Sequence, residues 1–162
     1  DDVMLALDGP ARLHGGPGDD SLSLELPHQD AAGSTLIGGA GDDDFSVRRA
    51  PQGAGAITIK GGAGRDRIAT DIRAGDTFVF RGDWGRDRLS DSETEARMRA
   101  TDFAGTIRIG GATEARSHAE FLAALTPHGG GVRYDLGSDG RNTIHFDRIG
   151  MDAFTADVLD FV

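Results

Sequence analysis

The 162-residue chain contains no cysteine, one tryptophan and one tyrosine. Without cysteine, the fold can contain neither a disulfide nor a thiolate metal site. No apolar run approaches the ~20 residues of a membrane-spanning helix, so no membrane span is expected. Basic residues are also in the minority, since 17 Lys and Arg stand against 27 Asp and Glu for a formal net charge of −10. Nucleic acids and anionic membrane surfaces are bound by basic faces, so this balance argues against both as partners.

Glycine, in contrast, is abundant, with 25 residues against a usual share of ~7%. Many of these glycines belong to a nine-residue motif, G-G-x-G-x-D-x-U-x, in which U is a large apolar residue. Full copies begin at Gly15, Gly38 and Gly61, and a weaker copy begins at Gly82, where Asp83 replaces the second glycine. The motif therefore recurs with a period of about 23 residues, which is the scale of solenoid repeats. A period this regular predicts a repeat architecture.

The residues around each motif alternate in polarity, as strands do. Ser34–Ile37 precedes the second copy and Asp44–Val47 follows it, and loop-forming residues occupy Arg48–Gly55 before the next period. One period is therefore predicted to be strand, glycine turn, strand and loop, which is one coil of a solenoid with parallel strands. The segment Asp2–Leu7 mirrors Asp20–Leu26 in its alternation and fits the same arrangement.

Stacked coils would place Asp20, Asp43, Asp66 and Asp87 in one column. Neighbouring strands lie ~4.8 Å apart, and two carboxylates at that distance repel by ~3.5 kcal/mol at an effective dielectric constant of 20. Such a column opposes folding unless a cation neutralises it. Carboxylates together with backbone carbonyls at a turn are the hard oxygen ligands that Ca²⁺ prefers, whereas Zn²⁺ would favour His or Cys. The alternative is that the turns simply connect strands, but three full copies at a constant period favour calcium binding.

The motif resembles the calcium-binding repeat of the RTX family, in which the first six positions form the turn. The resemblance implies an all-β fold, a right-handed parallel β-roll or β-helix solenoid, with about three calcium ions between the stacked turns. Carboxylate ligands would be Asp20, Asp43, Asp66 and Asp87. Backbone carbonyl ligands would come from Gly15, Gly16, Pro17, Gly18, Gly38, Gly39, Ala40, Gly41, Gly61, Gly62, Ala63 and Gly64. Core positions would be Leu22, Phe45, Ile68 and Leu89.

The sequence departs from the family in its spacing. Family repeats usually follow one another directly, so that both edges of the roll carry calcium turns. Here one motif occurs per coil of about 23 residues, so we expect calcium turns on one edge only, with irregular loops on the other. The fourth turn, Gly82–Asp87, has Trp84 where the other copies have a small residue or proline. We expect Trp84 to pack beneath this turn, the alternative being a platform for a sugar ring.

The repeats end at Asp91, which divides the chain into a predicted β-roll (1–91) and a C-terminal capping and secretion-signal region (92–162). The second region predicts a strand over Thr106–Ile109, a helix over Ser117–Leu125 that begins with a capping box, and a hairpin within Val132–Ile149. Its order resembles the C-terminal region of RTX proteins, and the acidic and apolar tail Val158–Val162 resembles a signal read by type I secretion machinery.

These features imply a calcium-dependent folding and secretion module that is secreted to the extracellular side of a bacterium. The chain opens at Asp1 without methionine, so we expect a longer protein with an upstream catalytic or adhesive domain. The segment itself is not expected to be an enzyme. Its five histidines form no HExxH pair, and no GxSxG or Walker sequence is present.

An accessory polysaccharide-binding role is the alternative, because RTX modules also follow the catalytic domains of some alginate epimerases. That role would use a basic stripe beside the turns. Its candidates are Arg48, Arg49, Lys60, Arg65, Arg67, Arg86 and Arg88.

Overall fold

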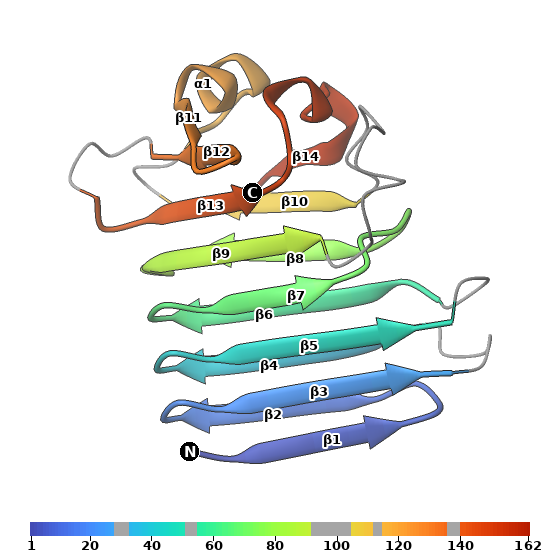
Figure 1. Cartoon of the computed structure of the whole chain (residues 1–162). Helices are drawn as coiled ribbons and strands as arrows, with labels where there is room; N and C mark the ends of the chain where they lie inside the picture. Colours follow the sequence, from blue (N-terminus) through green and yellow to red (C-terminus); the bar gives the residue numbers. More distant parts are fainter. Residues whose placement is uncertain (28–32, 51–54, 92–104, 112–114, 136–139) are drawn as a thin grey trace.

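The computed structural model describes residues 1–27, 33–50, 55–91, 105–111, 115–135 and 140–162 (Figure 1). Within them the chain is mostly β, with a single α-helix. The strands of the repeat region are β1 (Val3–Leu7), β2 (Arg12–Pro17), β3 (Ser21–Leu26), β4 (Ser34–Ala40), β5 (Asp44–Arg49), β6 (Ile57–Ala63), β7 (Arg67–Thr70), β8 (Thr77–Arg81) and β9 (Arg86–Asp91). The later elements are β10 (Thr106–Gly110), α1 (His118–Ala123), β11 (Leu125–His128), β12 (Gly131–Tyr134), β13 (Thr143–Asp147), the 3₁₀ turns η1 (Met151–Ala153) and η2 (Ala156–Val158), and β14 (Leu159–Phe161).

The strands form two sheets, and successive strands from β1 to β10 alternate between them. The eight-stranded sheet has the order β1-β3-β5-β7-β9-β13-β12-β11, and the six-stranded sheet has the order β14-β10-β8-β6-β4-β2. The two sheets stack one behind the other in Figure 1, with the short glycine turns at one edge. Strand pairing is parallel except between β11 and β12 and between β12 and β13.

Strand pairing follows the motif spacing, as predicted. Leu22 lies opposite Phe45 in one sheet and Leu36 lies opposite Ile59 in the other, so each residue faces its equivalent in the next repeat. At the N-terminus β1 pairs with β3, with Val3 opposite Ser21, which confirms the arrangement expected for Asp2–Leu7.

The glycine turns are tighter than the six positions expected from the family. Strands β2, β4 and β6 continue through the first three residues of each motif, because the parallel ladder still pairs Gly16 with Gly39 and Gly39 with Gly62. The chain therefore reverses over the fourth to sixth positions. At the fourth position Gly41 has a φ of +133°, a conformation in which a side chain would be strained.

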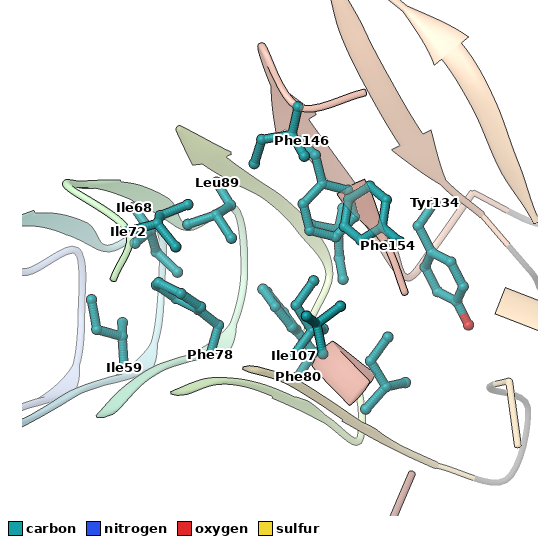
Figure 2. Close-up of a cluster of buried hydrophobic side chains, with 14 of the residues drawn as sticks. Ile59, Ile68, Ile72, Phe78, Phe80, Leu89, Ile107, Tyr134, Phe146 and Phe154 are labelled. Atoms are coloured by element: carbon teal, nitrogen blue, oxygen red, sulfur yellow. The ribbon is translucent and has the colours of Figure 1, made fainter. Parts of the chain in front are cut away.

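The core lies between the two sheets and continues without a break from the coils into the C-terminal region (Figure 2). The four apolar residues after the aspartates are buried as predicted, namely Leu22, Phe45, Ile68 and Leu89. Leu89 lies opposite Phe146 of β13, and Phe146 packs against Phe154 with ring centroids 4.8 Å apart. Large aromatic side chains thus close the end of the stack.

The C-terminal region extends both sheets beyond residue 91. Strand β13 pairs in parallel with β9, and β10 pairs with β8 and with β14. The predicted helix is present as α1, and the Ser117 hydroxyl accepts a hydrogen bond from the Glu120 backbone N–H at 3.2 Å. The Glu120 carboxylate accepts from the Arg116 N–H rather than from the N–H of Ser117, so the capping box is displaced by one residue.

A buried ion pair holds the loop edge, at the opposite end of the strands from the glycine turns. The side chains of Arg49 and Asp76 are both fully buried, with Arg49 Nη1 and Nη2 donating to the two Asp76 carboxylate oxygens at 2.9 and 2.6 Å. Asp76 also accepts from the backbone N–H groups of Ile57 and Arg73. The buried carboxylate of Asp76 at this edge is therefore neutralised by the guanidinium group of Arg49.

No helix in the described part of the chain is long and apolar enough to cross a membrane.

Candidate metal site at the glycine turns

The four sixth-position aspartates form one column at the turn edge of the eight-stranded sheet. Each comes immediately before a strand of that sheet or at its first residues, in β3, β5, β7 or β9. Their exposed fractions are 2% for Asp20, 1% for Asp43, 1% for Asp66 and 3% for Asp87. The sequence therefore predicted both the column and its members correctly.

One oxygen of each carboxylate joins successive turns. The Oδ1 atoms of Asp43, Asp66 and Asp87 each accept a hydrogen bond from the backbone N–H of the preceding aspartate in the column, at 2.9, 3.0 and 3.0 Å. Asp20 Oδ1 accepts likewise from the N–H of Asp2 at 2.6 Å. These bonds join the turns of the stack, and they are strongest when the accepting carboxylate is ionised.

The other oxygen of each carboxylate is buried and has no hydrogen-bond partner. This holds for the Oδ2 atoms of all four aspartates, Asp20, Asp43, Asp66 and Asp87. Leaving a buried charged oxygen without a hydrogen-bond partner costs several kcal/mol. Four such oxygens in one column therefore favour the binding of a hydrogen-bond donor or a cation.

The first glycine of each full motif has no side chain, and this leaves room for the Oδ2 atom. A Cβ added at Gly38 would lie 2.0 Å from Asp43 Oδ2 and 2.7 Å from the carbonyl oxygen of Gly61 in the next turn. A carboxylate oxygen and a carbonyl oxygen of neighbouring turns thus face the same point. Gly15 and Gly61 approach the Oδ2 atoms of their own aspartates, Asp20 and Asp66, in the same way.

The other residues that were predicted to supply carbonyl ligands lie where the turns stack closely. A Cβ at Gly39, Gly41, Gly62 or Gly64 would lie 2.0–2.3 Å from a carbonyl oxygen of the preceding turn, that of Gly16, Gly18, Gly39 and Gly41 respectively. The third-position carbonyls of Ala40 and Ala63 accept hydrogen bonds from Gly18 and Gly41. Pro17, the third-position residue of the first turn, ends β2 opposite Ala40.

Burial dominates the electrostatics of the column. It raises the pKa of Asp43, it raises that of Asp66 to about 7, and it raises that of Asp87 to about 8. The neighbouring aspartate adds to the rise for Asp66 and for Asp87, while the hydrogen bond from the preceding turn opposes it. Without a cation, burial therefore shifts Asp43, Asp66 and Asp87 toward their protonated forms.

The outer carboxylates of Asp19 and Asp42 also join turns, which the sequence did not indicate. Asp19 Oδ1 accepts from the N–H of Asp42 at 2.8 Å, and Asp42 Oδ1 accepts from the N–H of Arg65 at 2.9 Å. Both groups are exposed. Asp44 faces solvent as expected.

The fourth turn differs from the other three. A Cβ at Gly82 would meet nothing within 4 Å, and Trp84 is 1% exposed beneath the turn, with its ring edge-on to Phe80 at 6.1 Å. The predicted packing of Trp84 is confirmed, and no indole face is left for a sugar.

Asn142 closes this fourth turn from the C-terminal region, a role that the sequence did not predict. Its Oδ1 accepts from the N–H of Gly85 at 3.1 Å, and its Nδ2 donates to the carbonyl of Gly82 at 3.0 Å. The only sequence signal is the similarity of GRNTI, from Gly140, to GRDRL, from Gly85. Thr143 pairs with Arg86 and Ile144 pairs with Asp87, so Asn142 lies level with Gly85 and outside the column of aspartates.

Replacing Asn142 with Ala is expected to lower the free energy of unfolding by about 1–3 kcal/mol, because the Gly85 N–H and the Gly82 carbonyl both lose a partner. Urea denaturation in saturating calcium measures this. Asn142→Asp keeps the acceptor for the Gly85 N–H but loses the Nδ2 donor to the Gly82 carbonyl, so it should lose only part of this free energy. An unchanged unfolding midpoint for Asn142→Ala would show that the contact does not stabilise the junction.

In the part of the chain that the structure describes, no three His, Cys, Asp or Glu side chains converge on one point. A metal ion between two turns would therefore take at most two carboxylates of the column, and backbone carbonyls would complete its coordination.

Comparison with protein-family models, with curated proteins and with solved structures finds no match to this chain.

Proposed function

We propose that this chain is a calcium-binding module of the RTX type, a right-handed parallel β-roll whose one-sided glycine turns hold calcium ions. The observation that carries the proposal is the column of four buried Oδ2 atoms without partners. Calcium suits them because it accepts flexible arrangements of six to eight oxygen ligands, including carboxylates and backbone carbonyls. About three ions, one between each pair of successive turns, would add six positive charges to a chain with a net charge of −10.

Calcium would then act as the switch for folding. In a cytosol with little calcium, repulsion within the column and the ordering entropy of a glycine-rich chain favour the unfolded state. An unfolded chain can pass through type I secretion machinery, and millimolar calcium outside a bacterium would fold it. Binding free energy then becomes folding free energy. We infer a secreted, extracellular, non-enzymatic module that stabilises and helps export a larger protein carrying an upstream catalytic or adhesive domain.

A calcium titration followed by far-UV circular dichroism tests the proposal. Starting in EGTA, the β signal should appear with a midpoint on the order of 10⁻⁴–10⁻³ M calcium, the range of extracellular calcium modules. Magnesium at the same concentrations is the control, since its strict octahedral geometry suits these turns poorly. A spectrum that is β-rich in EGTA and unchanged by calcium would overturn the proposal.

A further inference from the structure

Both sheets end together at the N-terminal end of the stack, where β1 and β2 lie (Figure 1). Among the strands that the structure describes, β1 has β3 as its only hydrogen-bonded neighbour and β2 has only β4. The Asp2 carbonyl accepts a hydrogen bond from β3, and the Asp8 N–H donates one to β3. Backbone groups of successive residues in a strand point to opposite sides. Those of Val3, Leu5 and Leu7 therefore point away from β3, toward the open edge.

Strand β2 is oriented in the same way. The Ala11 carbonyl accepts a hydrogen bond from the Thr35 N–H of β4 at 2.8 Å, so the backbone groups of Arg12 and His14 point to the open edge. The N-terminal end therefore presents two rows of backbone donors and acceptors, one in each sheet, that can pair with further strands.

The core is also open at this end. Ala6 lies opposite Leu24 and Leu13 lies opposite Leu36, and all four pack in the core between the sheets. Leu24 and Leu36 are 0% exposed, whereas Ala6 and Leu13 are only half-buried. One further strand in each sheet would complete their burial, as each coil does for its neighbour.

The outer face of β1 is apolar. Its exposed side chains are Val3 at 88%, Leu5 at 57% and Leu7 at 63%, and the strand contains neither a charged residue nor a proline. At the other end of the stack, β11 contains Pro127 and β14 has only three residues. Proline and short strands block pairing at a sheet edge. Strand β1 has neither protection, so its edge is suited to an interface.

We propose that a second copy of this chain docks on this end, about a two-fold axis parallel to the strands. Strand β1 of each copy then pairs antiparallel with β2 of the other copy. Both sheets continue through the junction, and the open end of each core faces the other.

The rise of the coils selects this axis. Because each coil climbs by ~4.8 Å, β2 lies about 2.4 Å further along the stack than β1. With the axis parallel to the strands, each junction joins a β1 to a β2, so both junctions have the same width. An axis perpendicular to the sheets would pair β1 with β1 and β2 with β2, and the two junctions would differ in width by ~4.8 Å. Only the first arrangement closes both sheets.

The strand sequences fit this pairing. When Leu5 lies opposite His14 of the partner subunit, the outward backbone groups of both residues face each other and form two hydrogen bonds. In the same register Ala6 lies opposite Leu13 of the partner subunit. The half-buried side chains of both copies therefore meet and close the core.

Charge and shape also favour a second copy. Asp8 follows β1 and Arg12 begins β2, both at the loop edge, so the axis brings each beside the opposite charge of the other copy. The C-terminal end is covered by α1 and by the aromatic cluster around Phe154 (Figure 1). The contact is therefore head to head, and it closes after two chains instead of continuing as a filament.

Size-exclusion chromatography with multi-angle light scattering tests the proposal in millimolar calcium. As the chain concentration rises from about 1 to about 100 µM, the mass should approach twice the 17.0 kDa of one chain. Leu5→Pro and His14→Pro each remove one N–H of the proposed pair and spare the hydrogen bonds to β3 and β4. Each should weaken the dimer at least about tenfold, because the symmetric dimer contains the pair twice. The matched control Leu5→Thr keeps the N–H and should change the dissociation constant less than about threefold.

Circular dichroism at the same concentrations reports folding, so this test is separate from that of calcium binding. A folded wild-type chain that stays monomeric at about 100 µM would overturn the dimer and leave the calcium proposal untouched. A mass that grows beyond two chains would overturn the closed two-fold arrangement. A dimer that both proline variants leave intact, or that Leu5→Thr weakens as much as they do, would overturn the strand pairing.

Hydrogen exchange of the wild-type chain answers the same question if a proline variant does not fold. The backbone N–H groups of Leu5 and His14 should exchange slowly at high chain concentration and faster on dilution, because dimerisation protects them. Fast exchange at every concentration would overturn the proposal.

Discussion

In EGTA, raising the pH from about 5 to about 8.5 is expected to lower the free energy of unfolding by on the order of 5 kcal/mol. Burial, with a contribution from the neighbouring aspartate, raises the pKa of Asp66 to about 7 and that of Asp87 to about 8. In the unfolded chain both groups titrate near 4. The folded state therefore holds protons that the unfolded state has lost, so stability is fully present below about pH 4 and is lost as the pH rises through 7 and 8.

Burial also raises the pKa of Asp43, which acts in the same direction, and the two other shifted carboxyl groups do not obscure this window. Burial favours a raised pKa for Asp147, but hydrogen bonds from Arg88 and Ser90 outweigh it and the net pKa is lowered. The pKa of Asp157 is also lowered, chiefly by a hydrogen bond from Thr155. Both groups are ionised in the folded and unfolded states above pH 5, so neither contributes to the slope there.

In saturating calcium the free energy of unfolding should instead rise between about pH 5 and about pH 8.5. A metal ion requires deprotonated ligands, so protons compete with calcium at about pH 5 and cease to do so at about pH 8.5. Urea denaturation gives the midpoints in calcium at both pH values and in EGTA at about pH 5. Circular dichroism gives the folded fraction in EGTA at about pH 8.5, where the calcium-free chain is expected to be largely unfolded. A chain that is as fully folded in EGTA at about pH 8.5 as at about pH 5 would show that these carboxyl groups do not limit the stability of the calcium-free fold.

The column of aspartates could be predicted from sequence because it depends on periodicity alone. A parallel register of one repeat places Asp43 beside Asp20 and Asp66 whatever the loops between them do. The same register made the burial of Phe45 predictable, since it follows Asp43 by two positions and points to the face between the sheets.

The contacts that could not be predicted lie outside the repeat. Arg49 and Asp76 are 27 residues apart, in loop-edge segments without a motif, and nothing local marks them as partners. The pairing of β13 with β9 joins segments that are separated in the sequence by β10, α1, β11 and β12. Only the placement of the C-terminal region on the stack brings His145 beside Arg88.

The direction of the hydrogen bonds in the column also needed the structure. The sequence predicted four carboxylates that repel one another, but Oδ1 of each accepts from a turn and only Oδ2 lacks a partner. The carboxylates therefore have two separate roles. One oxygen stabilises the stack in every condition, and the other is available to a proton or to a cation.

Replacing Asp66 with Asn should separate these two roles and change stability with opposite signs in the two conditions. The Asn side chain keeps an oxygen for the Asp43 N–H, which donates to Asp66 Oδ1 at 3.0 Å, but it removes a buried charge. At about pH 8.5 in EGTA the variant should be more stable than the wild type by on the order of 2–4 kcal/mol, since an isolated buried carboxylate is costly. In calcium it should lose one of the proposed carboxylate ligands, and the calcium midpoint should rise at least tenfold.

Asp44→Asn is the matched control, because it removes the same charge from an exposed position. Asp44 comes directly after Asp43, the column aspartate of the turn that precedes Asp66. Its calcium midpoint should move less than threefold, and its stability in EGTA should change by less than about 0.5 kcal/mol, as for most surface substitutions. Calcium titrations of both variants, together with the folded fraction of each in EGTA from circular dichroism, give the four values. If Asp66→Asn responds to calcium as the wild type does, Asp66 is not a ligand. If both variants shift equally, the calcium response reflects overall charge, and the partnerless Oδ2 atoms have no special part in it.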